Sequence, residues 1–141
     1  MKELLNKIVK SEIEMKEFAI EFFNKIEKGS LVCLNGNLGV GKTFFVKAIC
    51  EYLNIDNSSS PTFSIVNEYS GKEKIYHFDF YRLKNSEELF DIGFNEYLSD
   101  EDAYKFVEWA ELIPEVLPKH YYEVKIDTLT SGEREIFVFK K

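Results

Sequence analysis

The sequence predicts a three-layer α/β sandwich, with a mostly parallel central sheet and antiparallel hairpin additions. A short, continuously apolar run at 31–34 is typical of a strand buried on both faces, as in a parallel sheet, and 104–109 is predicted to be another buried strand. Amphipathic helical segments separate these strands, and alternating segments within 63–80 and 122–139 indicate two β-hairpins. This order of elements is that of an α/β sheet. The 141 residues are the length of one domain, 1–141.

The first predicted element is an amphipathic helix over residues 11–28. Ser11 is a suitable N-cap, and Glu14 three residues later completes a capping box. Gly29 then ends the helix. The apolar face of this helix consists of Ile13, Phe18, Ile20, Phe22, Phe23 and Ile26. The residues before Ser11 mix charge into every turn, so they are neither a signal peptide nor a membrane anchor, and we assign no element to them.

The middle of the chain predicts a strand, a helix and a hairpin. The strand at 31–34 leads through a glycine-rich loop into a helix at 42–53. Residues 54–61, with the sequence NIDNSSSP, are the most loop-like stretch of the chain. Two strands then follow at 63–69 and 74–80, and the short turn between them predicts a β-hairpin.

The last part of the chain predicts one more helix and three more strands. A helix covers 85–98, with either Asn85 or Ser86 as its N-cap. A buried strand at 104–109 precedes a short helical or turn segment that contains two prolines. The final hairpin has its strands at 122–129 and 135–139, around the turn sequence TSGE.

Composition and charge exclude several classes of protein. The net charge is −7 and the only arginines are Arg82 and Arg134, whereas a protein that grips nucleic acid by itself normally has a basic face. Any nucleic acid would therefore be held mainly by a partner protein. No apolar run approaches the roughly 18 residues of a membrane span, so we expect a cytoplasmic protein. In that compartment Cys33 and Cys50 are expected to be small buried apolar residues.

The sequence GNLGVGKT at 36–43 carries the chemistry, because it has every required residue of a P-loop: Gly36, Gly41, Lys42 and Thr43. The glycines let backbone N–H groups turn toward a phosphate. The lysine places a positive charge on the β- and γ-phosphates, and the threonine hydroxyl binds Mg²⁺. The helix that follows directs its positive N-terminal end at the same phosphates. The sequence therefore predicts a nucleoside triphosphate bound with Mg²⁺ in a P-loop NTPase-like fold, and ATP is the expected nucleotide.

Two acidic residues are candidates for the second part of the magnesium site. A P-loop needs such an acid, usually at the end of a buried strand. Asp79 and Glu108 each end a predicted strand, and the sequence leaves open which of them would bind Mg²⁺ directly. His77 alternates with Asp79 on one strand face, so it either lines the site or is a structural histidine with satisfied hydrogen bonds, which is the commoner case. Thr62 either senses the γ-phosphate or caps the strand that follows it.

Three other classes of P-loop protein are alternatives to an ATPase. A small nucleoside or metabolite kinase is the first, but such kinases usually need an arginine-rich lid, which two arginines do not provide. A GTPase usually carries Asn-Lys-x-Asp late in the fold, and the nearest match, at 24–27, precedes the P-loop and ends in glutamate. The third is a binding module whose ATP is never hydrolysed. A P-loop protein without an arginine finger should hydrolyse ATP slowly by itself.

Five segments in order resemble the TsaE family, the small ATPases needed to form threonylcarbamoyladenosine on tRNA. They are GNLGVGKT at 36–43, SPTFSIVNEY at 60–69, YHFDFYRL at 76–83, EELFDIGFNEYL at 87–98 and VEWAE at 107–111. The resemblance implies that Thr43, Asp79 and Glu108 form the magnesium site and that Thr62 is a switch threonine. It places Trp109 beside the nucleotide, and it brings Ser11 and the turn that ends at Arg134 toward the base.

The nucleotide-contacting segment expected around the P-loop comprises Asn37, Leu38, Gly39, Val40, Gly41, Lys42, Thr43 and Phe44. Val40 stands where many members of the family carry alanine, a change that should leave the loop undisturbed. Lys42, Thr62, Asp79 and Glu108 are the expected catalytic group. The resemblance also implies a partner, the TsaB–TsaD heterodimer, which carries out the transfer to adenosine 37 of tRNA. The chain would contact tRNA only indirectly, and ATP binding and hydrolysis would reset the complex between turnovers.

Overall fold

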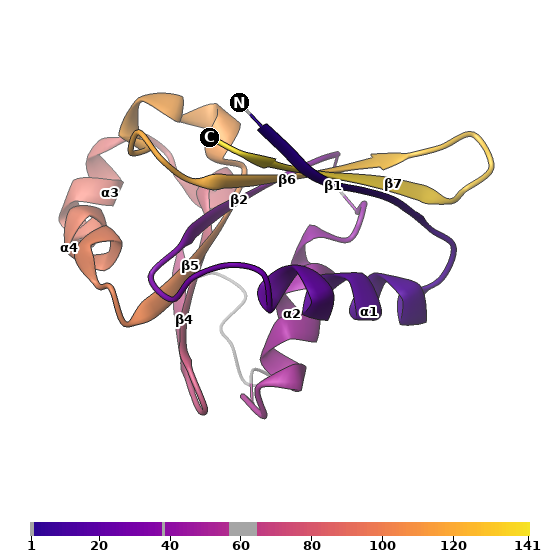
Figure 1. The fold of residues 1–141 in the computed structure, drawn as a ribbon. Coiled ribbons are helices and arrows are strands. Elements are labelled where there is room, and N and C mark those ends of the chain that lie inside the picture. Colours follow the sequence, from indigo (N-terminus) through magenta and orange to yellow (C-terminus); the bar gives the residue numbers. More distant parts are fainter. Residues whose placement is uncertain (1, 38, 57–64) are drawn as a thin grey trace.

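One mixed sheet with helices on both faces forms the fold (Figure 1). The computed structural model describes residues 2–37, 39–56 and 65–141, and the elements below are those of this part of the chain. The strands are β1 (Lys2–Val9), β2 (Leu31–Asn35), β3 (Val66–Ser70), β4 (Lys74–Asp79), β5 (Ala103–Glu108), β6 (Tyr122–Thr128) and β7 (Arg134–Lys140). The α-helices are α1 (Glu12–Phe23), α2 (Lys42–Tyr52), α3 (Glu87–Asp91) and α4 (Phe94–Ser99). Short 3₁₀ helices are η1 (Phe80–Arg82), η2 (Ala110–Leu112) and η3 (Pro114–Val116).

The sheet has a parallel centre and antiparallel edges. Its strand order is β1-β7-β6-β2-β5-β4-β3. β2 pairs in parallel with β5 on one side and β6 on the other, and β5 pairs in parallel with β4. The outer pairs β3–β4, β6–β7 and β1–β7 are antiparallel. This arrangement confirms the predicted fold class, including both hairpins.

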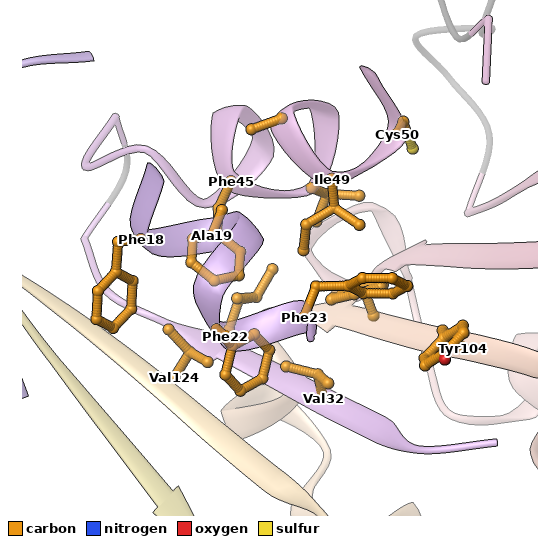
Figure 2. Packing of buried hydrophobic residues seen from close by; sticks show 14 of the residues in the cluster. Phe18, Ala19, Phe22, Phe23, Val32, Phe45, Ile49, Cys50, Tyr104 and Val124 are labelled. Atoms are coloured by element: carbon orange, nitrogen blue, oxygen red, sulfur yellow. The ribbon is translucent and has the colours of Figure 1, made fainter. Parts of the chain in front are cut away.

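Alternate residues of β2 explain why the sheet needs a cover on each face. Val32 and Leu34 belong to the core cluster that also contains the apolar residues of α1 and α2. Leu31 and Cys33 belong to a second cluster, which α3 and α4 cover. Figure 1 shows the two helix pairs on opposite sides of the sheet, and Figure 2 shows the first cluster, where Phe side chains of α1 and α2 meet over β2 and β6. The result is the three-layer arrangement that the sequence predicts.

The N-terminal strand β1 was not predicted. Its residues are nearly all exposed, and charged side chains interrupt any alternation of apolar and polar residues. The strand is stabilised instead by antiparallel pairing with β7, from Lys2 opposite Lys140 to Val9 opposite Arg134. Such pairing between distant parts of the chain has no local sequence signal, and charged residues are common on edge strands.

Two predicted helices are shorter in the structure. The helix at 11–28 ends at Phe23, and 3₁₀-type hydrogen bonds, including Lys25 N–H to Phe22 O, tighten its end well before Gly29. Ile13, which we expected on its apolar face, is 69% exposed, and Met15 is buried in its place. The predicted helix at 85–98 is broken by Gly93, whose φ of 76° places it in the left-handed conformation that ends α3.

The other boundaries that lie within the described residues agree closely with the sequence analysis, whereas residues 57–61 of the predicted loop and the first two residues of the strand predicted at 63–69 lie outside them. Ser86 occupies the N-cap position of α3 without a side-chain capping bond, and the side chain of Asn85 accepts the Glu88 N–H at 3.3 Å. Cys33 and Cys50 are both buried, and burial raises the pKa of the Cys33 thiol to about 12. Within the described residues, none of the helices combines the length and the apolar composition that crossing a membrane requires.

Candidate nucleotide-binding site

The P-loop leaves β2 at its C-terminal end and enters α2 at Lys42, as the sequence predicts. Gly41 is the N-cap of α2 with φ of 115°, a conformation that side chains disfavour. A Cβ on Gly36 would lie 2.7 Å from the carbonyl oxygen of Ile126, so glycine is required there by close packing against β6. Asn37 and Gly39 are exposed and Val40 is buried, whereas Leu38 lies outside the described residues.

Lys42 is buried beneath the loop, at 4% exposure. Its ammonium group donates a hydrogen bond to Gly36 O at 2.7 Å and lies 3.5 Å from the centre of the Trp109 ring. Burial lowers the pKa of Lys42, although the negative charges of Glu108, Glu111 and Asp79 act in the opposite direction. A buried ammonium group whose direct partners, a carbonyl oxygen and an indole ring, are both uncharged is well suited to bind an anion.

Glu108 connects the P-loop to the neighbouring strand. The hydroxyl of Thr43 is 2.9 Å from Glu108 Oε2 and 3.1 Å from Oε1, and His77 Nε2 is 2.6 Å from Oε2. Glu108 is 5% exposed, and burial by itself raises its pKa. The hydrogen bond and charge of His77, the hydrogen bond of Thr43 and the charge of Lys42 outweigh burial and hold the pKa of Glu108 below its usual value. The Glu108 carboxylate is therefore ionised, and it contacts Thr43 in the first turn of α2.

Asp79 lies beside Glu108 in the register of β4 and β5. Its Oδ1 accepts the Tyr81 N–H at 3.1 Å, and its Oδ2 is 3.3 Å from Nε of Arg82. The carboxylate therefore caps η1 and neutralises an arginine. Of the two candidate acids, Glu108 is the one whose side chain contacts Thr43.

The donor atoms gathered here fit a magnesium ion. Mg²⁺ prefers oxygen ligands and usually keeps several waters and substrate phosphate oxygens, so one or two protein ligands are enough. Thr43 and Glu108 present a hydroxyl and an ionised carboxylate in contact with each other, and Asp79 adds a second carboxylate on the adjacent strand. The described residues contain no cluster of three or more His, Cys, Asp or Glu that could hold a metal alone. A site that shares its ion with a phosphate does not need one.

Trp109 is the first residue after β5, and its backbone has an unusual conformation. Its φ of 64° is in the left-handed region, which costs a side-chain-bearing residue about 1–3 kcal/mol and occurs mainly at functional sites. The ring packs against Tyr81, with centroids 5.1 Å apart, and also contacts the ammonium group of Lys42. The sequence analysis expected Trp109 to extend the strand and did not identify Tyr81 as its neighbour.

A cavity of about 380 Å³ opens beside the P-loop. Most of the remaining predicted nucleotide-contacting residues line it: Ser11, Gly39, Val40, Gly41, Phe44 and Arg134. Ser11 is also the N-cap of α1, where its hydroxyl accepts the Glu14 N–H at 3.1 Å. Arg134 reaches toward Gly39 O at 3.5 Å, and its Nε is buried without a hydrogen-bond partner. Segments from the start of α1, the P-loop and the β6–β7 turn thus meet at one cavity beside the P-loop.

Folding brings together two groups of the predicted site residues. Lys42, Thr43, Asp79, Glu108 and Trp109 lie at the carboxyl ends of β2, β4 and β5, the edge where parallel α/β sheets bind ligands. Ser11 and Arg134 line the adjacent cavity. Thr62 lies outside the described residues. His77 was favoured as a structural histidine, and the structure gives it a contact with the candidate acid.

A P-loop between a central parallel strand and the helix that follows it, with an acid on the neighbouring strand, defines the P-loop class of α/β proteins. Comparison with known proteins identifies the family within this class. The model of the TsaE family, described as threonylcarbamoyl adenosine biosynthesis protein TsaE, matches residues 9–136. The chain therefore belongs to the TsaE family, as the five sequence segments indicated.

Individual relatives agree with this assignment. The chain is 41% identical over 130 residues to the tRNA threonylcarbamoyladenosine biosynthesis protein TsaE of Rickettsia bellii, covering 90% of this chain and 89% of the relative. It is 41% identical over 110 residues to the protein of that name from Bacillus subtilis, covering 77% and 68%. The crystal structure of Bacillus subtilis YdiB superposes with a TM-score of 0.80 at 31% identity, over 98% of this chain and 86% of the other.

Proposed function

We propose that this protein binds ATP with Mg²⁺, hydrolyses it slowly and acts in the cytoplasm in the threonylcarbamoyl modification of tRNA adenosine 37. One observation carries the ATP and Mg²⁺ part of the proposal: at the start of α2, Thr43 contacts the buried, ionised Glu108 while Lys42 lies beneath the loop. This is the arrangement a P-loop uses to hold a magnesium-bound triphosphate. Family membership supports the role in tRNA modification.

The residues around the P-loop would divide the work of binding. Lys42 would exchange its bond to Gly36 O for the phosphates, since its charge has little water to lose. Thr43 and Glu108 would hold Mg²⁺, which would neutralise charge on the phosphates. Ser11, Phe44 and Arg134 would contact the base or ribose from the cavity beside the loop.

Slow hydrolysis follows from the positions of the two arginines. Arg82 pairs with Asp79, and Arg134 lies at the P-loop backbone. Neither arrangement resembles the arginine-rich lid of a kinase, so transfer of the phosphoryl group to a small molecule is disfavoured. A P-loop protein without an arginine finger usually depends on a partner for rapid hydrolysis.

We infer that the partner is a TsaB–TsaD heterodimer and that ATP binding and hydrolysis reset this complex between turnovers. The acidic net charge of −7 is consistent with indirect contact to tRNA, since the chain itself offers little attraction to a polyanion.

Nucleotide titrations test the first part of this proposal. Calorimetry with ATP, GTP and ADP, each with Mg²⁺ and with EDTA, should show magnesium-dependent binding of ATP and weak hydrolysis. Lys42→Ala should bind at least tenfold less tightly, since a hydrogen-bonded charge is worth about 1.5–3 kcal/mol. A strong preference for GTP, or efficient transfer of the phosphoryl group to a nucleoside or small alcohol, would contradict the proposal.

A further inference from the structure

His77 is the buried one of the two histidines of this chain. It lies on β4, where it pairs in register with Phe106 of β5 and Asn67 of β3. Ile75, two residues away on the same strand face, belongs to the core under α1 and α2, so the histidine faces the helix that begins at the P-loop. His77 is 8% exposed as a residue, and burial of a polar ring at this position calls for a specific partner.

That partner is the candidate magnesium acid. His77 Nε2 lies 2.6 Å from Oε2 of Glu108, and the Thr43 hydroxyl lies 2.9 Å from the same oxygen. The oxygen of an ionised carboxylate can only accept hydrogen bonds, so both neighbours donate. The Nε2 atom of His77 therefore carries a proton.

We propose that His77 is a positioning residue for the magnesium side of the P-loop, acting through Glu108. This inference rests on the proposed function. Donation from His77 fixes the rotation of the Glu108 carboxylate, and the carboxylate in turn accepts the proton of Thr43. The threonine hydroxyl then uses its proton for Glu108 and keeps its oxygen lone pairs available to an ion, beside the fixed carboxylate. The hydrogen bonds from His77 and Thr43 to Glu108 thus connect β4, β5 and the first turn of α2, so the side chain on β4 helps to orient the threonine.

Removal of this donor should weaken the magnesium-dependent part of nucleotide binding. The variant His77→Leu keeps roughly the volume of the side chain but has no donor. His77→Gln restores an amide N–H at about the distance of Nε2. The control His120→Leu makes the same change at the exposed histidine, before β6 and at the opposite end of the sheet from the P-loop.

Each protein is titrated with a non-hydrolysable ATP analogue in Mg²⁺ and in EDTA, and its unfolding temperature is recorded. In Mg²⁺, the affinity of His77→Leu for the analogue should be lower than that of the wild type by a factor of about ten or more. In EDTA, the two proteins should bind the analogue equally well. His77→Gln should recover most of the loss, and His120→Leu should match the wild type. Equal weakening of His77→Leu and His77→Gln, with the same loss in EDTA, is what a merely structural histidine would give and overturns the inference.

A spectroscopic measurement decides the matter even if His77→Leu does not fold. In His120→Leu the sole histidine is His77, so its ¹⁵N ring signals need no further assignment. Nε2 should carry a slowly exchanging proton whose signal shifts when Mg²⁺ and the analogue are added, and shifts much less with the analogue in EDTA. A deprotonated Nε2, or signals that ignore Mg²⁺, overturns the inference. Absence of magnesium-dependent binding in the wild type would instead overturn the proposed function.

Discussion

The ammonium group of Lys42 lies 3.5 Å from the centre of the Trp109 ring, and the two residues come from different segments of the sheet edge. A cation over the face of an indole ring is attracted by the ring's electrons. Trp109 holds this position although its backbone is in the left-handed region, with φ of 64°. The P-loop lysine therefore has an aromatic partner at the edge of the sheet.

Because Trp109 is the only tryptophan, its fluorescence should report what happens to Lys42. Addition of ATP with Mg²⁺ should draw the ammonium group toward the phosphates and change the intensity or wavelength of emission. A titration read by intrinsic fluorescence measures this directly. Lys42→Met removes the cation, so its spectrum should differ from the wild type and stay constant as nucleotide is added. An unchanged wild-type spectrum at saturating ATP, with binding shown by calorimetry, would contradict a movement of Lys42.

Neutral variants of the two acids should impair hydrolysis and leave the fold intact. Glu108→Gln and Asp79→Asn remove one charge each, and the amide oxygen introduced by Asp79→Asn can still accept the Tyr81 N–H that caps η1. Magnesium-dependent turnover of ATP should fall by about tenfold or more, since each variant weakens contact with a charged group. Glu115→Gln, at an exposed acid of η3 that is not among the charges acting on Lys42, is the matched control. Normal turnover in both variants would remove these residues from the site.

Gly36 and Gly39 should respond differently to alanine. A Cβ at Gly36 meets Ile126 O and a Val40 methyl group at 2.7 Å each, whereas a Cβ at Gly39 meets nothing within 4 Å. Gly36→Ala should therefore lower the free energy of unfolding by about 1–3 kcal/mol from overpacking, in addition to backbone strain. Gly39→Ala should carry only the strain of its φ of 81°, about 1–2 kcal/mol. Urea denaturation compares the two, and equal losses would show that the backbone at Ile126 moves aside.

Asp100 should make stability depend on acidic pH. Hydrogen bonds from Tyr76, then from Lys74 and the Asp102 N–H, lower the pKa of Asp100 from 3.8 to about 2. A carboxyl group whose pKa is lower in the folded state stabilises the fold above its unfolded pKa, and this contribution disappears as the pH falls through the folded value. The stabilisation should thus be complete above about pH 4 and lost toward pH 2.

The variant Asp100→Asn isolates the contribution of Asp100 to the pH dependence of stability from that of the other titrating groups. It should unfold more readily than the wild type at pH 7, and the difference should shrink between pH 4 and pH 2. Asp91→Asn, an exposed aspartate at the end of α3, makes the same charge change. Denaturant unfolding at several pH values measures both. A difference that stays constant down to pH 2 would exclude Asp100 as the titrating group.

The sequence was most informative where local pattern and chemistry coincide. The apolar run of β2, the glycines of the P-loop and the apolar face of α2 lie next to one another in the chain, so the strand, loop and helix could be predicted together. The proximity of the candidate acids Asp79 and Glu108 could be predicted because parallel strands bring their carboxyl ends to one edge. β1 could not be predicted, because its stability comes from pairing with β7 at the other end of the chain.

Side-chain contacts between neighbouring strands could not be predicted either, because they too join residues that are distant in the sequence. Alternation predicts that His77 and Asp79 share a face of β4, but not that Glu108 points toward the histidine. The register of β4 and β5 and the rotamers in the core decide that contact. Likewise Tyr81 meets Trp109 only because η1 and η2 follow adjacent strands.

Nucleotide-dependent association with a TsaB–TsaD heterodimer tests the central claim most directly. Tagged wild-type protein and Lys42→Ala are each incubated with the heterodimer, with and without ATP and Mg²⁺, and the retained subunits are quantified. ATP should change retention by the wild type several-fold and leave Lys42→Ala unaffected. Equal retention of the heterodimer by both proteins under all conditions, or no retention by either, would contradict an ATP-driven reset of that complex.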